Sequence, residues 1–199
     1  MYVHYDAIRK KTVLFYIHRL GSEHPSSAEK SSRGVKDRVR ASLEHIANNS
    51  SHITALKNCP FIIQQPTFTS SIIFWTETLH KERLSMWKKE DDGKKDIANI
   101  DTYDMHNITR YVHSYAANIE ILQRTLYFIK TEHIWFSKDA VFGEKYRPSP
   151  WYQQTIDTIE SQIFQIDVIV TWTREVLERT KILIELVSVW CLTKEDASY

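Results

Sequence analysis

The segment SPWYQQTIDTIESQIFQIDVIVTWTREVLERTKILIELVSVWC, residues 149–191, decides the fold class. Its apolar and small residues recur at alternating steps of three and four, the spacing of one face of a helix and of a coiled-coil seam. Ser149 and Pro150 are typical of a helix start, with serine as the cap and proline at the first helical position. The expected packing seam consists of Ile156, Ile159, Ile163, Ile166, Val170, Thr173, Leu177, Thr180, Ile184, Val187 and Cys191.

The segment before it repeats this pattern over about four heptads. Asp101 and Asp104 fit the start of this helix, where free amides and the helix dipole favour carboxylates. Gly143 and Pro148 predict that it ends in a loop over residues 137–150. Two long helices with a short connection fold back as an antiparallel pair. The expected seam of this helix consists of Ile108, Val112, Tyr115, Ile119, Leu122, Leu126, Ile129, His133 and Phe136.

Before residue 101 the periodic patterns of apolar residues are shorter. Alternating apolar residues within 1–20 predict a short β-hairpin, and residues 21–33 read as a loop. Residues 34–95 show helical spacing, except that the charged stretch Lys88–Lys95 reads as a loop. We therefore expect a mainly α protein of one domain, with a hairpin remnant, a helical segment and a long, coiled-coil-like antiparallel helical hairpin over 101–199.

Composition limits the possible classes of function. The chain has 199 residues, 42% hydrophobic and 26% charged, as in globular proteins. Its net charge of +1 gives no field that attracts nucleic acid, so no nucleic-acid partner is expected. The balance is +5 over residues 1–40 and −4 over residues 151–199, which favours attraction within the chain or between subunits. Two cysteines make no disulfide framework, so a cytoplasmic location is expected. No apolar run approaches the roughly 20 residues of a membrane span.

Motifs that carry catalysis are missing from the sequence. There is no Cys-x-x-Cys, His-Glu-x-x-His, Gly-rich phosphate loop or Gly-x-Ser-x-Gly turn. We therefore expect a protein that is not an enzyme, without catalytic residues and without a bound cofactor. A site assembled from scattered residues stays an alternative, and it requires a concave pocket with converging titratable groups.

Three groups of residues leave a choice between a site and a solvated surface. His106 and His113, seven apart on one helix face near Asp104, either hold a metal or are exposed. A run of carboxylates either binds Mg²⁺ or Ca²⁺ or is solvated. A basic cluster either contacts phosphates or anionic lipid or faces solvent. The acidic run is Asp91, Asp92, Asp96, Asp101 and Asp104, and the basic cluster is Arg33, Lys36, Arg38 and Arg40.

A resemblance covers most of the chain and is clearest over residues 151–196. A long helix starts at Trp151-Tyr152 and runs through REVLERT (174–180) and ILIELVSVW (182–190) to TKED (193–196). This resembles the stalk helix of fungal CorA-like proteins, relatives of the CorA magnesium transporters. In that family a Glu-Arg-x-x-x-Leu-Ile-like segment leads into an apolar turn and a polar stretch.

The resemblance implies a non-catalytic cytosolic domain of a divalent-metal-ion transporter, with a structural or regulatory role. It also implies self-association through long helices and a response to Mg²⁺. The family's pore lies in two membrane helices with a Gly-Met-Asn signature, which this sequence does not contain. Membrane association is therefore expected only through segments outside this sequence. The alternative is a stand-alone helical protein-interaction module.

Overall fold

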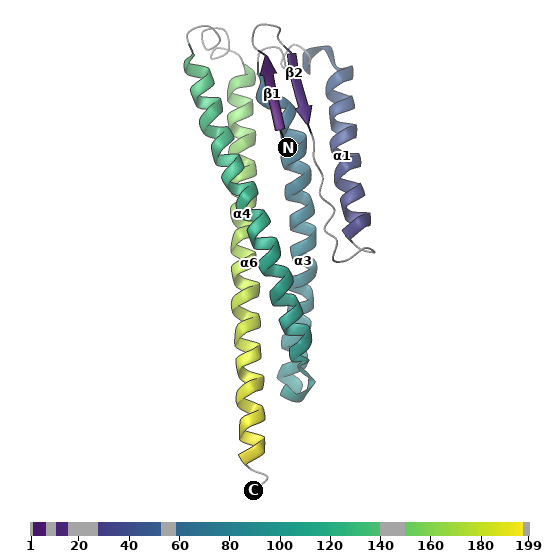
Figure 1. The fold of residues 1–199 in the computed structure, drawn as a ribbon, viewed down its shortest axis with the longest axis vertical. Helices are drawn as coiled ribbons and strands as arrows, with labels where there is room; N and C mark the ends of the chain where they lie inside the picture. Colours follow the sequence, from purple (N-terminus) through teal and green to yellow (C-terminus); the bar gives the residue numbers. More distant parts are fainter. Residues whose placement is uncertain (1, 7–10, 16–27, 53–58, 140–149, 197–199) are drawn as a thin grey trace. The chain divides into compact units, whose positions relative to one another are not determined.

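The computed structural model describes residues 2–6, 11–15, 28–52, 59–139 and 150–196. This part of the chain is mainly α-helical, which confirms the expected fold class at that level (Figure 1). Its principal elements are α1 (Ala28–Asn48), the 3₁₀ turn η1 (Pro60–Gln64), α3 (Gln65–Lys95), the 3₁₀ turn η2 (Ile97–Asn99), α4 (Thr102–Lys138) and α6 (Pro150–Asp196).

Two strands precede the helices. β1 (Tyr2–Asp6) and β2 (Lys11–Phe15) pair antiparallel, with Tyr2 opposite Phe15 and Asp6 opposite Lys11. The connection between them, residues 7–10, lies outside the described residues. The β-hairpin expected within residues 1–20 therefore stays a prediction.

Two of the three predicted loops need correction, and most of the third, expected over residues 137–150, lies outside the described residues. Helix α1 begins at Ala28, inside the loop expected over residues 21–33, and α3 continues through the stretch Lys88–Lys95. In that stretch Lys94 pairs with Asp91 at 3.0 Å and Lys95 with Asp92 at 3.4 Å. Residues three apart are neighbours on a helix, so opposite charges at this spacing support the last turns of α3. Charge density alone was therefore a poor sign of a loop.

The start of α4 agrees with the sequence prediction. The helix begins at Thr102, and the backbone N–H of Tyr103 donates to Asp101 Oδ1 at 2.9 Å. Asp104 lies in the first turn. These carboxylates satisfy and face the free amides at the positive end of the helix dipole.

Helices α3, α4 and α6 each contribute to two compact units. The first unit comprises residues 1–74 and 125–163, and the second comprises residues 75–124 and 164–199. The unit boundaries therefore fall inside helices.

The first unit has an aromatic core around Cys59. Cys59 and Ile62 are buried, and partly buried aromatic side chains from η1, α4 and α6 pack against them: Phe61, Phe136, Trp151 and Tyr152. Lys130 pairs with Glu160 at 2.8 Å, and Ser137 Oγ donates to Tyr152 Oη at 3.5 Å. Residue numbers rise along α4 as they fall along α6, so the two helices run antiparallel within this unit.

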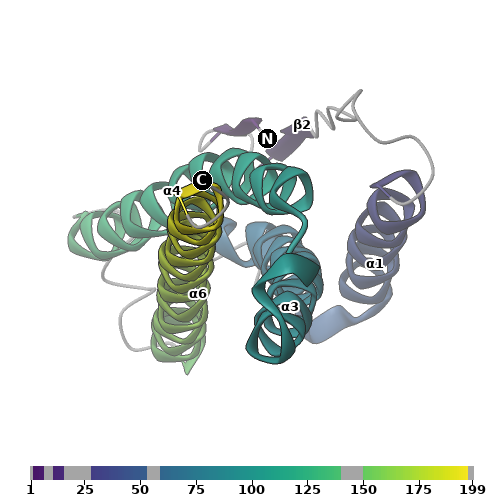
Figure 2. The same ribbon diagram turned by 90° about the horizontal axis from the view of Figure 1, so that it is seen from below.

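The second unit has an aliphatic and methionine-rich core. Figure 2 shows α3, α4 and α6, the helices that contribute to it, from below. Lys89 of α3 pairs with Asp104 of α4, and Gln123 of α4 donates to Asp167 of α6 at 2.6 Å. Its fully buried side chains include Leu79, Met86, Met105, Val112, Ile119, Ile166, Ile169, Val176 and Thr180.

Gly93 allows a close approach near the end of α3 in the second unit. Ile100, buried after η2, lies against it. A Cβ added at Gly93 would lie 2.8 Å from Ile100 Cγ1 and closer still to Cδ1. Glycine in a helix costs about 1 kcal/mol relative to alanine. Here the smaller residue makes room for the Ile100 side chain.

We predict that Gly93→Ala destabilises the native chain but stabilises a chain in which Ile100 is replaced by alanine. In the native background the clash costs about 1–3 kcal/mol, which outweighs the gain of about 1 kcal/mol in helix propensity. In an Ile100→Ala background the clash is gone, so Gly93→Ala stabilises the chain. Urea unfolding of the four variants measures this, and equal effects in both backgrounds would show that the contact is relaxed without cost.

Candidate functional site

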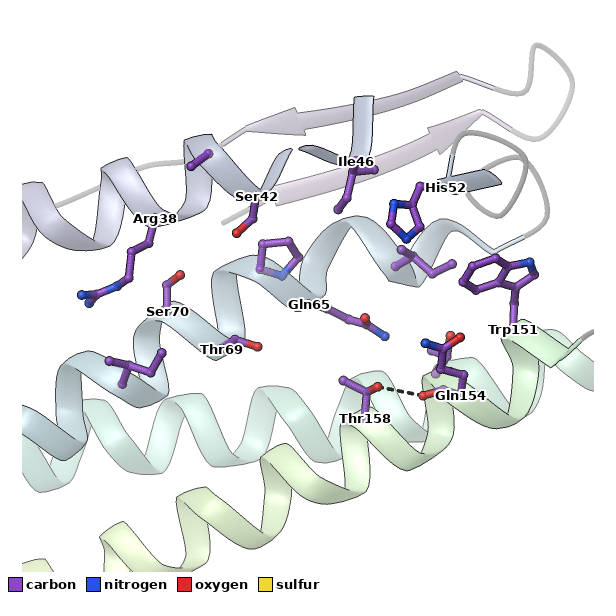
Figure 3. A pocket seen from close by; sticks show the side chains of 15 residues that line it. Arg38, Ser42, Ile46, His52, Gln65, Thr69, Ser70, Trp151, Gln154 and Thr158 are labelled. Atoms are coloured by element: carbon purple, nitrogen blue, oxygen red, sulfur yellow. Dashed lines mark hydrogen bonds between the residues drawn. The ribbon is translucent and has the colours of Figure 1, made fainter. Parts of the chain in front are cut away.

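A cavity of about 510 Å³ lies in the first unit, between α1, the start of α3 and the start of α6. Figure 3 shows Arg38, Ser42, Thr69 and Ser70 toward one end, and His52 and Trp151 toward the other. Pockets of about 300–1,000 Å³ are usual for small ligands. The described residues that line it also include Ala41, Ile46, Ile62, Gln65, Pro66, Ile73, Gln154, Thr155 and Thr158.

Arg38 gives the cavity its charge. Its Nε is buried and has no hydrogen-bond partner among the described residues. By contrast Arg40, two residues along α1, pairs with Glu44 at 2.9 Å. Arginine stays protonated in proteins and carries donors only. Because the described lining residues include no carboxylate, nothing in the lining neutralises this guanidinium.

Hydroxyl and amide groups surround the Arg38 end. Gln162, buried on α6, donates its Nε2 to Thr69 Oγ1 at 2.9 Å and to the Gln65 carbonyl at 3.4 Å. The Thr69 hydroxyl accepts that bond, so its own hydrogen is available for another acceptor. Ser70 is buried beside it. This end of the cavity can therefore donate several hydrogen bonds.

Aromatic rings form the other end. The His52 ring packs edge-on to Trp151, with centroids 6.0 Å apart, and its Nδ1 is buried without a hydrogen-bond partner. The His45 ring also packs edge-on to His52, with centroids 5.7 Å apart. Trp151 thus offers an apolar wall close to one polar nitrogen.

A second candidate surface is an exposed apolar stripe near the end of α6, in the second unit. The stripe consists of Ile182, Leu186, Val189 and Leu192, with exposed fractions of 49%, 49%, 60% and 63%. Residues spaced by three and four lie on one helix face. Leu183 and Val187, on another face of the same turns, are buried. This part of α6 is therefore apolar on more than one face.

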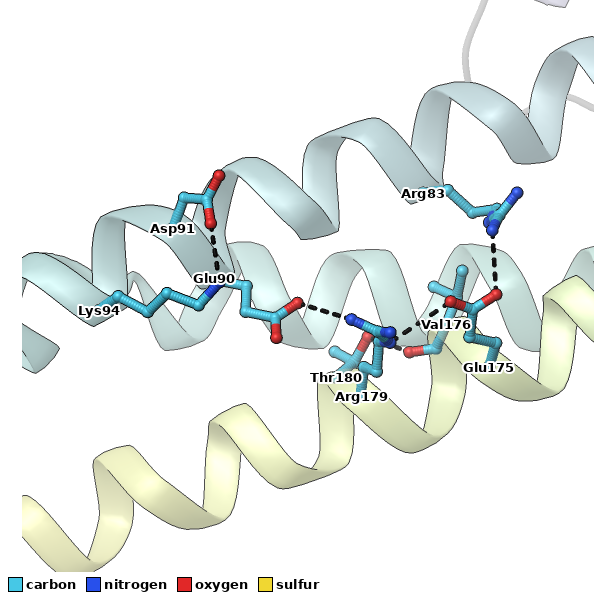
Figure 4. A network of polar contacts seen from close by, with 8 residues as sticks. All are labelled: Arg83, Glu90, Asp91, Lys94, Glu175, Val176, Arg179 and Thr180. Atoms are coloured by element: carbon cyan, nitrogen blue, oxygen red, sulfur yellow. Dashed lines mark hydrogen bonds and ion pairs between the residues drawn. The ribbon is translucent and has the colours of Figure 1, made fainter.

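An ion-pair network joins α3 to α6 in the second unit (Figure 4). The Arg83 guanidinium lies 4.4 Å from the centre of the Trp172 ring and 4.8 Å from that of Trp87, and its Nη2 is 3.1 Å from Glu175. Arg179 bridges Glu175 at 3.4 Å and Glu90 at 3.0 Å. The two guanidinium groups and the two carboxylates of this network balance in charge, so we interpret the network as a structural contact between α3 and α6.

The structure places the expected seam residues at different depths. On α4, Ile108, Val112, Ile119, Leu126 and Ile129 are buried, whereas Tyr115 and Leu122 are partly buried. On α6, Ile159, Ile163, Ile166 and Val187 are buried, whereas Ile156, Val170, Leu177 and Ile184 are partly buried. Cys191 is exposed. Between Ile166 and Val187 the most buried apolar residues of α6 are Ile169, Val176 and Leu183. Each of them lies one residue before an expected seam position.

The described part of the chain contains no group of three or more side chains that could hold a metal ion. His106 and His113 are exposed. The acidic run is engaged locally, since Asp91 and Asp92 pair with lysines and Asp104 with Lys89. Asp96 caps η2 by accepting from the Ala98 N–H. The carboxylates therefore serve helix ends and ion pairs.

The sequence patterns did not predict the cavity. Of the basic cluster, Lys36 and Arg40 are exposed, whereas Arg38 turns into the cavity. A hint was available in the helical spacing, because Arg38 adjoins the buried Val39 and follows the buried Val35 by three residues. His52 and Trp151 join it only through the tertiary fold.

Comparison with known proteins adds no family to this picture. No protein-family model matches the chain, and no curated protein or solved structure matches it. Among the described residues, no helix is sufficiently long and apolar to cross a membrane.

His133 is a buried histidine in the core of the first unit. Its ring stacks on Tyr152 at 5.1 Å and meets the edge of Phe61 at 5.3 Å. Burial lowers the pKa of His133 from 6.5 to about 4, because the charged form loses its hydration. The folded chain therefore holds this ring neutral at pH values where the unfolded chain protonates it.

We predict that acid weakens the fold through His133. Between pH 6.5 and about 4 the unfolded state binds the extra proton, so stability falls as the pH falls through this window. The loss is at most about 3 kcal/mol. Urea unfolding at pH 7 and 4.5 should show a smaller loss for His133→Gln than for the native chain. The control His106→Gln, at an exposed position, should keep the native loss, and an unchanged loss in both variants would contradict the assignment.

Proposed function

We propose that this chain is a non-catalytic helical domain that works by association, with the apolar stripe of α6 as its contact surface. The partner surface is the same stripe on a second copy. In its specific form, the domain is the cytosolic stalk portion of a CorA-like divalent-metal-ion transporter. Its role is then to couple the cytosolic part to a membrane pore carried by other segments.

The observation that carries the proposal is the exposure of Ile182, Leu186, Val189 and Leu192 on one face of α6. A helix that is apolar on several faces is normally buried on several faces. Neighbouring apolar residues on the surface of a protein mark sites of contact with proteins or membranes. Lys181 and Glu185 form an exposed ion pair at 3.8 Å within α6, so charged side chains stand next to Ile182 and Leu186 along the helix.

The resemblance supplies the specific form of this proposal. The residues that carry it, 151–196, include the whole stripe. The proposed pairing of α4 and α6 as a long antiparallel, coiled-coil-like hairpin would hold this stalk straight. Antiparallel contacts such as Lys130–Glu160 support it within the first unit.

The rival is a stand-alone interaction module that binds a different protein. It is favoured by the exposed Phe128 and Trp135 of α4, since aromatic side chains are enriched at the centre of protein interfaces. They lie seven residues apart, on one helix face of the first unit. A chain that stays monomeric but has a specific protein partner would favour this rival.

We predict that Leu186→Glu/Val189→Glu abolishes self-association. Two carboxylates in the stripe cannot be buried against a second apolar stripe without a large desolvation cost. Sedimentation velocity at high micromolar concentration should show oligomers for the native chain and monomers for this variant. The control Ser114→Glu/Ala117→Glu adds the same charge, with the same spacing of three residues, at exposed positions of α4 and should still associate. A native monomer at these concentrations would refute self-association.

The CorA-like form predicts a response to Mg²⁺. With millimolar Mg²⁺ the sedimentation coefficient and the melting temperature should differ from those in NaCl of matched ionic strength. Ca²⁺ at the same concentration serves as a second control. Oligomers that form equally with and without Mg²⁺ would keep the association domain but remove the link to ion transport.

A further inference from the structure

We propose that the cavity of the first unit binds a small organic anion that carries a planar apolar group. Its anionic head lies against Arg38 and the hydroxyls of Thr69 and Ser70, and its apolar body lies toward Trp151. This inference is independent of the α6 stripe, because every described residue of the cavity belongs to the first unit.

Charge is the first argument. Arg38 brings a permanent positive charge to a lining without a described carboxylate, and its buried Nε has no partner among the described residues. A buried donor without an acceptor costs about 1–3 kcal/mol, and more when it is charged. Carboxylate and phosphate groups match the fork of donors on a guanidinium. An anionic ligand therefore supplies the hydrogen-bond acceptor and the negative charge that the described lining residues do not give Arg38.

The second argument is the arrangement of neutral donors. Ser42, Thr69 and Ser70 lie near Arg38 in Figure 3, and they come from two helices. Thr69 is held in place by Gln162, which leaves the Thr69 hydroxyl hydrogen free to point at a ligand. Neutral donors of this kind are compatible with an anion and add no charge of their own.

The aromatic end defines the rest of the ligand. Trp151 and Ile62 belong to the apolar cluster around Cys59, and Ile46 also lines the cavity. The unpartnered Nδ1 of His52 lies beside this wall. A planar apolar group packs well on such a surface, and a polar substituent on it can reach His52. A volume of about 510 Å³ holds an aromatic acid of metabolite size.

Phenyl phosphate and benzoate are suitable probes on the whole chain. Isothermal titration calorimetry should show binding of at least one of them. Preference between the two distinguishes a phosphate from a carboxylate ligand. Benzyl alcohol, which lacks the charge, should bind at least about tenfold more weakly. Inorganic phosphate should compete only weakly, because it lacks the apolar body.

Arg38→Gln should weaken binding by about tenfold or more, the value of one charge-assisted hydrogen bond. Arg40→Gln is the matched control, since it removes the same charge from the same helix at an exposed position, and it should bind like the native chain. Thr69→Val tests the donors by a second route and should weaken binding without removing a charge. No binding of either probe by the native chain would overturn the proposal. Equal losses in the Arg38 and Arg40 variants would overturn it as well, because they would indicate attraction to net charge rather than a site.

Discussion

The buried face of α6 is the constraint on which both units depend. In the first unit Ile159 and Ile163 are buried, and in the second unit Val176, Leu183 and Val187 are buried. The buried threonines Thr173 and Thr180 belong to the same face, and their hydroxyls are hydrogen-bonded within the helix. The hydroxyl of Thr173 donates to the Val170 carbonyl and that of Thr180 to the Val176 carbonyl, each at 2.6 Å. Such bonds within the helix allow a polar residue to be buried close to a neighbouring helix.

The two candidate sites, the stripe and the cavity, lie where the packing of α6 is incomplete. Toward the end of α6 the apolar residues exceed what the second unit buries, and the excess is the stripe from Ile182 to Leu192. At the start of α6 the opposite holds: Trp151, Gln154 and Thr158 face a cavity that side chains of the first unit do not fill. The stripe offers apolar area to another helix, whereas the cavity offers one guanidinium and several donors to a small anion. Neither property requires catalysis.

Helical periodicity carried most of what the sequence could reveal. The mainly α-helical class followed from steps of three and four, and the start of α4 followed from Asp101 and Asp104. Along the buried face of α6 the burial of each residue could not be predicted, because neighbouring apolar pairs such as Val176 and Leu177 satisfy the same spacing. The charged end of α3 was hidden because local ion pairs, rather than apolar residues, support it. The cavity was out of reach, since Arg38, Thr69 and Trp151 come from three distant segments and meet only in the tertiary fold.

The claim that α6 packs against a second copy is open to a direct measurement. Cys191 is exposed whereas Cys59 is buried, so a nitroxide label reacts at a single position near the stripe. About 200° of helix turn separates it from Val189, so the label does not lie on the stripe itself. Double electron–electron resonance at high micromolar concentration should detect dipolar coupling between labels on different chains, and the coupling should vanish for Leu186→Glu/Val189→Glu. A labelled native chain without intermolecular coupling would contradict the account.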